Sequence, residues 1–208
     1  MWITIGVATL LAIVALLLLP PHAHGNFVYW TNSSPGSSIG RAKINGSGVN
    51  DNFITGLSNP NGVAVDSKFV YWAETGANRI GRANLDSTAV NPNFITSGVT
   101  SPLGVAITSN AGIFWRNGTG MSVTIGHANA DGSNPVANFI SPVDTFCGIA
   151  ADQSFVYWLD NDGPGFHIGR APVSGGAPDS NFINVPSAGC GVAVDNNFLY
   201  WDAGLSRV

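Results

Sequence analysis

Phe27-Val28-Tyr29-Trp30 is the first of five aromatic segments that end in tryptophan and recur along the chain. Successive tryptophans are separated by 42, 43, 43 and 43 residues. A repeat of this length is too short to bury its own apolar faces, so the copies must stack on one another. The period therefore predicts a repeat architecture in which five tryptophans pack between repeats: Trp30, Trp72, Trp115, Trp158 and Trp201.

Three further segments keep the same period. In the second repeat, Gly62–Asp66 precedes the aromatic segment, and Ile80–Ala83 and Asn93–Ile95 follow it. Each is short, apolar and bounded by Gly, Pro, Asn or Ser, which is typical of strands joined by turns. Because no helical apolar period competes after residue 25, four strands per repeat predict an all-β propeller of four-stranded antiparallel blades over residues 26–208.

These repeats resemble the YWTD repeat of the low-density lipoprotein receptor class B propellers. The pattern carrying the resemblance is Pro60-x-Gly-Val-Ala-Val-Asp66, then Tyr71-Trp72, then Ile80–Asp86. The resemblance implies a receptor or scaffold domain without catalysis. Such propellers usually have six blades, so we expect residues 26–208 to form an incomplete arc of four blades and part of a fifth, with open strand edges. The family's acid after Tyr-Trp-Thr is replaced at most positions, which read Asn32, Glu74, Asn117, Asp160 and Ala203.

Residues 1–25 form a separate segment. Its apolar run ends at Pro20-Pro21, and Ala23-His24-Gly25 offers small residues to a signal peptidase. The segment predicts a secretory signal peptide; the alternative is an uncleaved membrane anchor over residues 2–19. Both predict a secreted or otherwise extracytoplasmic propeller, and membrane contact is expected only through this segment.

Composition limits the partners. The net charge is −4 and the chain has no basic patch, so we expect no binding of nucleic acid. No phosphate-binding glycine loop or zinc-ligand spacing is present, and we expect no cofactor. The remaining partner classes are a protein, a peptide or a glycan.

Candidate ligand-binding residues gather on one face of the predicted propeller, which we call the loop face. It carries the loops joining second to third strands and those joining each fourth strand to the next blade. Binding residues concentrate on loops held by a rigid scaffold, although a solvated polar rim is the alternative. The candidates are Asn32, Glu74, Arg116, Asn117, Asp160, Asp162 and His167 from the first set of loops, with Asn61 and Asp144 from the second.

Several other patterns favour structural roles. Asp160-Asn161-Asp162-Gly163 is similar to the start of a calcium loop but lacks the distant acid, so we expect a turn and no metal site. Recurring aspartates after each inner strand are expected to cap turns. Arginines in the third strands recur equally and are expected to be architectural. These residues are Asp66, Asp152 and Asp195, and Arg41, Arg82 and Arg170, with His127 in place of a fourth arginine.

Two alternatives stay open for the cysteines. Cys147 and Cys190 are 43 residues apart and each precedes the glycine of an inner strand. They form either a disulfide between adjacent blades or two free buried thiols.

Asparagine-containing turns carry two further predictions. Asn45-Gly46 and Asp131-Gly132 predict type I′ hairpins. N-glycosylation sequons begin at Asn32, Asn45 and Asn117.

Two functions therefore compete. The first is an extracytoplasmic binding or scaffold propeller. The second is a metal-dependent enzyme of the lactonase or lyase type, which requires polar side chains from several blades to converge on the channel. The predicted inner strands offer Val, Ala and Ile there instead, which favours the first.

Overall fold

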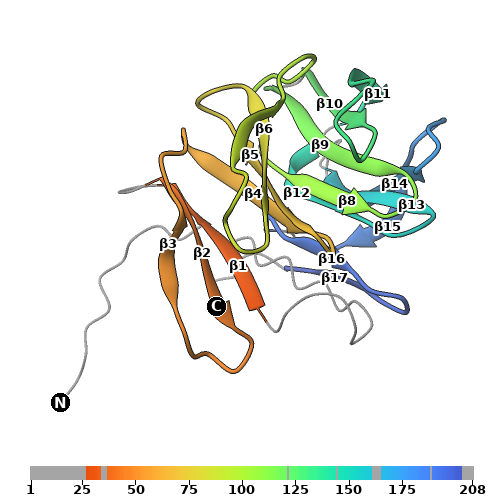
Figure 1. Ribbon diagram of the computed structural model, residues 1–208. Coiled ribbons are helices and arrows are strands. Elements are labelled where there is room, and N and C mark those ends of the chain that lie inside the picture. Colours follow the sequence, from red (N-terminus) through yellow and green to blue (C-terminus); the bar gives the residue numbers. More distant parts are fainter. Residues whose placement is uncertain are drawn as a thin grey trace.

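The computed structural model describes residues 27–33, 37–120, 122–143, 145–160, 165–187 and 189–202. The predicted leader, residues 1–25, lies outside these ranges, so neither alternative for it is tested. Among the described residues, no helix is both long and apolar enough to cross a membrane. The described strands form five antiparallel sheets, and successive sheets lie beside one another in chain order (Figure 1).

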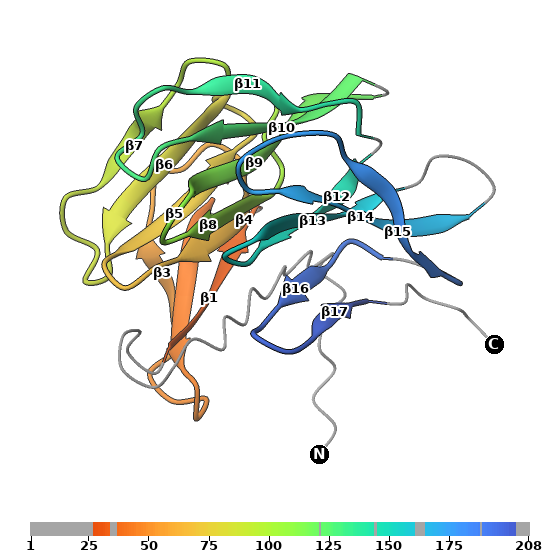
Figure 2. The same cartoon turned by 90° about the vertical axis from the view of Figure 1, so that its right-hand side faces the viewer.

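Each sheet is one blade. The first blade has three described strands, the next three blades have four each, and the last has two (Figure 2). This confirms the predicted all-β propeller of four-stranded antiparallel blades. The strands are β1 (Phe27–Asn32), β2 (Ser38–Lys43) and β3 (Asn50–Ile54); β4 (Pro60–Val65), β5 (Phe69–Glu74), β6 (Arg79–Asn84) and β7 (Asn91–Ile95); β8 (Val105–Thr108), β9 (Gly112–Thr119), β10 (Ser122–Ala128) and β11 (Val136–Ile140); β12 (Thr145–Ala151), β13 (Phe155–Asp160), β14 (Phe166–Pro172) and β15 (Asp179–Val185); β16 (Val192–Val194) and β17 (Leu199–Trp201).

Side chains that alternate along the second strand of a blade pack against opposite neighbours. In β5, Val70 and Trp72 pack with the first blade, whereas Tyr71 packs with the third. Trp115 and Trp158 likewise pack against the preceding blade, and all three of these tryptophans are fully buried. The predicted packing of tryptophan between blades is confirmed for these three residues.

A glycine in the third strand makes room for each of these tryptophans. Trp72 is the ladder partner of Gly81, and a Cβ on Gly81 would overlap the indole ring. Trp201 has no such partner among the described strands and is 39% exposed. Glycine in the recurring Ile-Gly-Arg-Ala segment is therefore a steric requirement. The same pairing recurs as Trp30–Gly40, Trp115–Gly126 and Trp158–Gly169.

A polar turn follows the inner strand of the second, fourth and last blades. The Asp66 carboxylate accepts the backbone N–H groups of Lys68 and Phe69, both at 2.7 Å. It also accepts the Tyr71 hydroxyl at 2.9 Å. Asp152 and Asp195 make the same three hydrogen bonds. The prediction that these aspartates cap turns is confirmed.

The recurring arginines stack between phenylalanines. The Cζ atom of Arg82 lies 4.2 Å from the ring centroid of Phe69 and 4.0 Å from that of Phe94. Arg41 and Arg170 are stacked in the same way in their own blades. A guanidinium over aromatic faces is held by cation–π attraction, so these arginines join the second strand to the outer strand.

The third blade replaces the aspartate, tyrosine and arginine together. Thr108, Phe114 and His127 stand at the three positions. The His127 ring stacks on Phe139 with 4.4 Å between ring centroids, and its Nε2 lies 2.6 Å from the Ala111 carbonyl oxygen.

The turns between third and fourth strands differ from the expected type I′ hairpins. Gly46 and Gly132 have φ of +81° and +84°, but Asn45 and Asp131 do not have positive φ. The Gly46 N–H donates to the Lys43 carbonyl at 2.8 Å, which closes a four-residue turn. Since type I′ needs positive φ at both central residues, that expectation is wrong. Glycine serves instead as the left-handed last residue of the turn.

Candidate functional site

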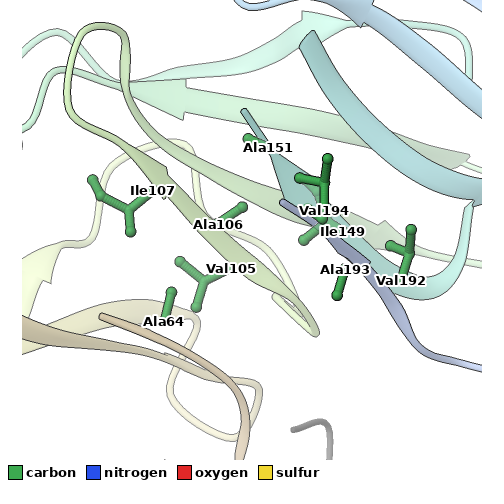
Figure 3. Close-up of a pocket in the computed structure, with 10 residues that line it drawn as sticks. Ala64, Val105, Ala106, Ile107, Ile149, Ala151, Val192, Ala193 and Val194 are labelled. Carbon is green, nitrogen blue, oxygen red and sulfur yellow. The ribbon is translucent and has the colours of Figure 1, made fainter. Parts of the chain in front are cut away.

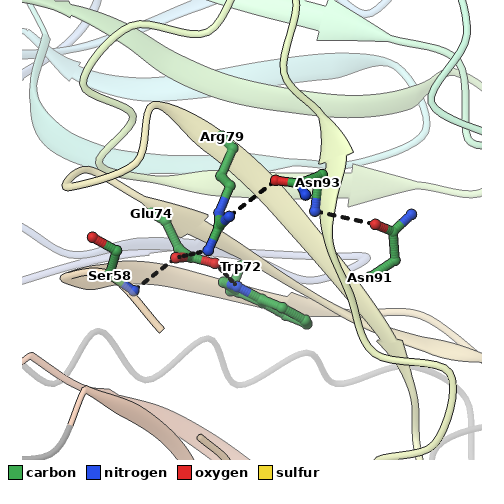
Figure 4. A network of polar contacts seen from close by, with 6 residues as sticks. All are labelled: Ser58, Trp72, Glu74, Arg79, Asn91 and Asn93. Carbon is green, nitrogen blue, oxygen red and sulfur yellow. Dashed lines mark hydrogen bonds and ion pairs between the residues drawn. The ribbon is translucent and has the colours of Figure 1, made fainter. Parts of the chain in front are cut away.

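Glu74 ends β5 on the loop face, where the sequence predicts an exposed side chain, either as a ligand-binding residue or as part of a solvated rim. Its side chain is instead 0% exposed. One carboxylate oxygen accepts the Trp72 indole N–H at 2.8 Å (Figure 4). The other accepts the Ser58 backbone N–H at 2.7 Å and pairs with the Arg79 guanidinium at 2.8 Å. The expectation of an exposed Glu74 is wrong, because the segment that enters the blade at Ser58 folds over it.

Asn117 takes the equivalent position in the third blade and is also buried. Its Oδ1 accepts the Thr100 backbone N–H at 2.6 Å, and its Nδ2 donates to the Ala137 carbonyl at 3.3 Å. Arg116 is buried beside it and donates from Nη1 to the Gly118 carbonyl at 3.1 Å. Burial lowers the pKa of the Arg116 guanidinium. The exposed rim expected at these two residues is therefore also wrong.

Asn32, Asn61 and His167 are half-buried on the loop face. The Nδ2 of Asn32 donates to Ser38 Oγ at 3.1 Å. The Nδ1 of His167 lies 2.7 Å from Asn184 Oδ1. These three residues keep part of their surface available to a ligand, in contrast to Glu74, Arg116 and Asn117.

The remaining loop-face candidates are not tested. Asp144 and Asp162 lie outside the described residues, and so does the side chain of Asp160. The partial calcium loop at residues 160–163 is therefore not described. Within the described part of the chain, no three His, Cys, Asp or Glu side chains are placed to hold a metal ion. The expectation of no metal site stays a prediction.

Aliphatic side chains line the channel between the inner strands. A cavity of about 40 Å³ lies between the described inner strands of four blades, and its lining consists of alanine, valine and isoleucine (Figure 3). Ala64, Val105, Ile149 and Val192 contribute one wall position from each blade. These side chains have no atom that can transfer a proton, attack a substrate or coordinate a metal.

A larger hollow opens on the opposite side of the propeller, which we call the turn face. It has a volume of about 450 Å³ and is lined by the turns that follow four inner strands. Asp66, Thr108, Asp152 and Asp195 stand at equivalent positions around it. Backbone N–H groups of Asn197 and Phe198 lower the pKa of the Asp195 carboxyl. Sequence reasoning placed the candidate site on the loop face and missed this hollow, although the recurring aspartates marked its rim.

The cysteines lie where two inner strands meet. Cys190 is disulfide-bonded. The side chain of Cys147, the other cysteine of the chain, lies outside the described side chains, so the Cys147–Cys190 pairing stays a prediction. The backbones approach closely at this point, because a Cβ added to Gly148 would lie 2.5 Å from the Cys190 carbonyl oxygen.

The first repeat matches a known family of propeller repeats. Residues 26–67 match the low-density lipoprotein receptor repeat class B. Residues 26–67 therefore carry a YWTD-type propeller repeat. The recurrence of the Tyr-Trp and Ile-Gly-Arg-Ala segments extends that pattern along the chain, and the resemblance predicted from the sequence is confirmed.

Solved structures of several kinds share this fold. A chain from a nidogen/laminin complex superposes with a TM-score of 0.68 at 21% identity, over 86% of this chain and 68% of that one. A gluconolactonase from Xanthomonas campestris superposes with a TM-score of 0.68 at 18% identity, over 86% of this chain and 67% of the gluconolactonase. The third is a catalytically inactive virginiamycin B lyase from Staphylococcus aureus, solved with quinupristin. It superposes with a TM-score of 0.61 at 16% identity, over 87% of this chain and 61% of the lyase. The chain thus spans about two thirds of their length, and these likenesses show the fold alone.

Proposed function

We propose that the chain is an extracytoplasmic binding or scaffold propeller that holds a protein, peptide or glycan and catalyses no reaction. The observation that carries the proposal is the apolar wall of the channel, formed by alanine, valine and isoleucine from four inner strands. An enzyme site needs acids, bases or metal ligands that converge on one point. The described inner strands place none of these along that wall.

The polar groups around the channel support the same proposal. Glu74 and Asn117 hold the segments that enter their blades, and the aspartates of the turn face hold their own turns. Each of these side chains is engaged in hydrogen bonds within the protein. The half-buried loop-face residues Asn32, Asn61 and His167 are among the polar side chains that a ligand could reach there.

A metal-dependent lactonase or lyase is the second candidate. Similarity of fold to the gluconolactonase and the virginiamycin B lyase favours it, as does the acidic stretch at residues 160–162. In the sequence, that stretch lies between the second and third strands of the fourth blade, β13 and β14.

Thermal melts with added calcium, combined with an assay of lactone hydrolysis, distinguish the two candidates. A cation that binds the native state alone raises the melting temperature. We expect calcium to leave the melting temperature unchanged and glucono-δ-lactone to be hydrolysed no faster than in buffer. A calcium-induced rise that is lost in Asp160→Asn and Asp162→Asn, together with lactone turnover, would establish the enzyme instead.

Binding is measured directly with two probes, a glycan array and immobilised laminin. Laminin is included because nidogen, which shares the fold, was solved in complex with it. We expect saturable binding to one of the probes, weakened in His167→Ala and unchanged in Lys68→Ala on the turn face.

A further inference from the structure

The three N-glycosylation sequons differ sharply in their surroundings. In N-glycosylation a bulky, hydrated sugar becomes bonded to the Nδ2 atom of asparagine, so that atom must face solvent in the folded protein. Exposure and hydrogen bonding of Nδ2 therefore distinguish a sequon that can carry a sugar from one that cannot.

Asn117 fails this requirement. Its side chain is 5% exposed, and both of its polar atoms are used inside the protein. Because Nδ2 donates to the Ala137 carbonyl, a sugar on that atom would have to displace the strand that carries Ala137.

Asn32 fails for a related reason. It is half-buried in β1, and its Nδ2 donates to Ser38 Oγ and to the Asp51 carbonyl, both at 3.1 Å. Two acceptors use both N–H groups of the amide. Attachment of a sugar replaces one of those hydrogens and would separate β1 from its neighbours.

Asn45 meets the requirement. It is exposed at the tip of the β2–β3 turn, and a Cβ placed on the adjacent Gly46 would meet nothing within 4 Å. Its Oδ1 accepts the backbone N–H of Ser47 at 3.0 Å and the Ser47 hydroxyl at 2.8 Å. No described residue accepts a hydrogen bond from its Nδ2.

We propose that Asn45 is the N-glycosylation site of this chain, and that Asn32 and Asn117 carry no sugar in the folded protein. The donor is a lipid-linked oligosaccharide diphosphate. A bond forms between Asn45 Nδ2 and the anomeric carbon of the first sugar. The bond from that carbon to the diphosphate oxygen breaks, the electron pair leaves with the lipid diphosphate, and the amide gives up one proton.

The hairpin of the third blade supplies a matched control. Asp131-Gly132-Ser133 has the same turn, in which Gly132 has φ of +84° and Asp131 Oδ1 accepts the Ser133 N–H at 2.9 Å. Asp131→Asn therefore creates an additional sequon in the same kind of turn, at an exposed position, although Gly132 lies against Phe94 whereas Gly46 faces open space.

The full chain is expressed in a mammalian cell line. After enzymatic release of N-glycans, mass spectrometry of the peptides identifies the asparagines that carried a sugar. We expect sugar at Asn45 only, its complete loss in Asn45→Gln and in Ser47→Ala, and one additional sugar in Asp131→Asn. Enzymatic release of the N-glycan should increase the electrophoretic mobility of the protein, and this change should persist in Asn32→Gln.

Three results would overturn the proposal. One is a sugar on Asn117 or Asn32 in folded protein. Another is an Asp131→Asn variant that carries a sugar at position 131 and none at Asn45. The third is the absence of sugar from both positions, because the proposal requires that the chain meets the glycosylation machinery.

Discussion

Replacing Glu74 with alanine tests whether the residue after Tyr-Trp is structural or a ligand contact. The change removes the acceptor for the Trp72 and Ser58 N–H groups and the counter-ion of Arg79. Removing one partner of a buried ion pair costs about 3–5 kcal/mol, and a buried donor without an acceptor costs about 1–3 kcal/mol. These terms overlap, since one carboxylate supplies all of them. The Arg79 side chain is 20% exposed and keeps some contact with water.

We therefore expect Glu74→Ala to lower the free energy of unfolding by about 3–5 kcal/mol in total. At about 2–4 °C per kcal/mol for a domain of this size, the melting temperature should fall by about 6–20 °C. Circular dichroism melts of the purified variant measure this shift.

Asp51→Ala is the matched control. Asp51 also accepts an indole N–H, from Trp30 at 3.2 Å, but at an exposed position. Water can replace that acceptor, so the expected loss is about 1 kcal/mol or less. If Glu74→Ala melted within the range of Asp51→Ala, the assignment of Glu74 as a buried structural carboxylate would be refuted.

Two further predictions concern sterics and pH. Gly81→Ala should lower the free energy of unfolding, measured by denaturant titration, by about 1–3 kcal/mol because the added Cβ overlaps the Trp72 indole. Gly165→Ala should be close to neutral, since its added Cβ would lie 3.5 Å from the nearest atom, Nε2 of His167. Burial and the Asp152 carboxylate raise the pKa of Tyr157 to about 12. A raised folded-state pKa means that this contribution to stability is complete below about pH 10 and is lost as the pH rises toward 12. Tyr157→Phe should make the alkaline decline of melting temperature shallower, and an unchanged decline would contradict the role given to Asp152.

The fold could be predicted from the sequence because its signals repeat. One copy of Phe-Val-Tyr-Trp is ambiguous, but several copies at one period locate the second strand of every blade, and Asp66 and Gly81 then occupy fixed places beside it. The loop face could not be predicted in the same way. Whether Glu74 is exposed depends on the path of residues 58–60, which differ between blades and contact it only after folding. The hairpins at Asn45 and Asp131 show a related limit, because the dipeptide predicts a tight turn but does not determine the length of the loop that closes it.

The position of each tryptophan makes the two ends of the arc of blades unequal. Trp72, Trp115 and Trp158 each lie over a glycine of their own blade and are covered by the blade before them. Peeling blades from the amino-terminal end would therefore uncover one indole at every step. Peeling from the other end would uncover the face that carries Tyr71, Phe114 or Tyr157. Unfolding that begins at the amino-terminal blade should therefore change tryptophan fluorescence at each step, in a different sequence from unfolding that begins at the carboxyl-terminal blade.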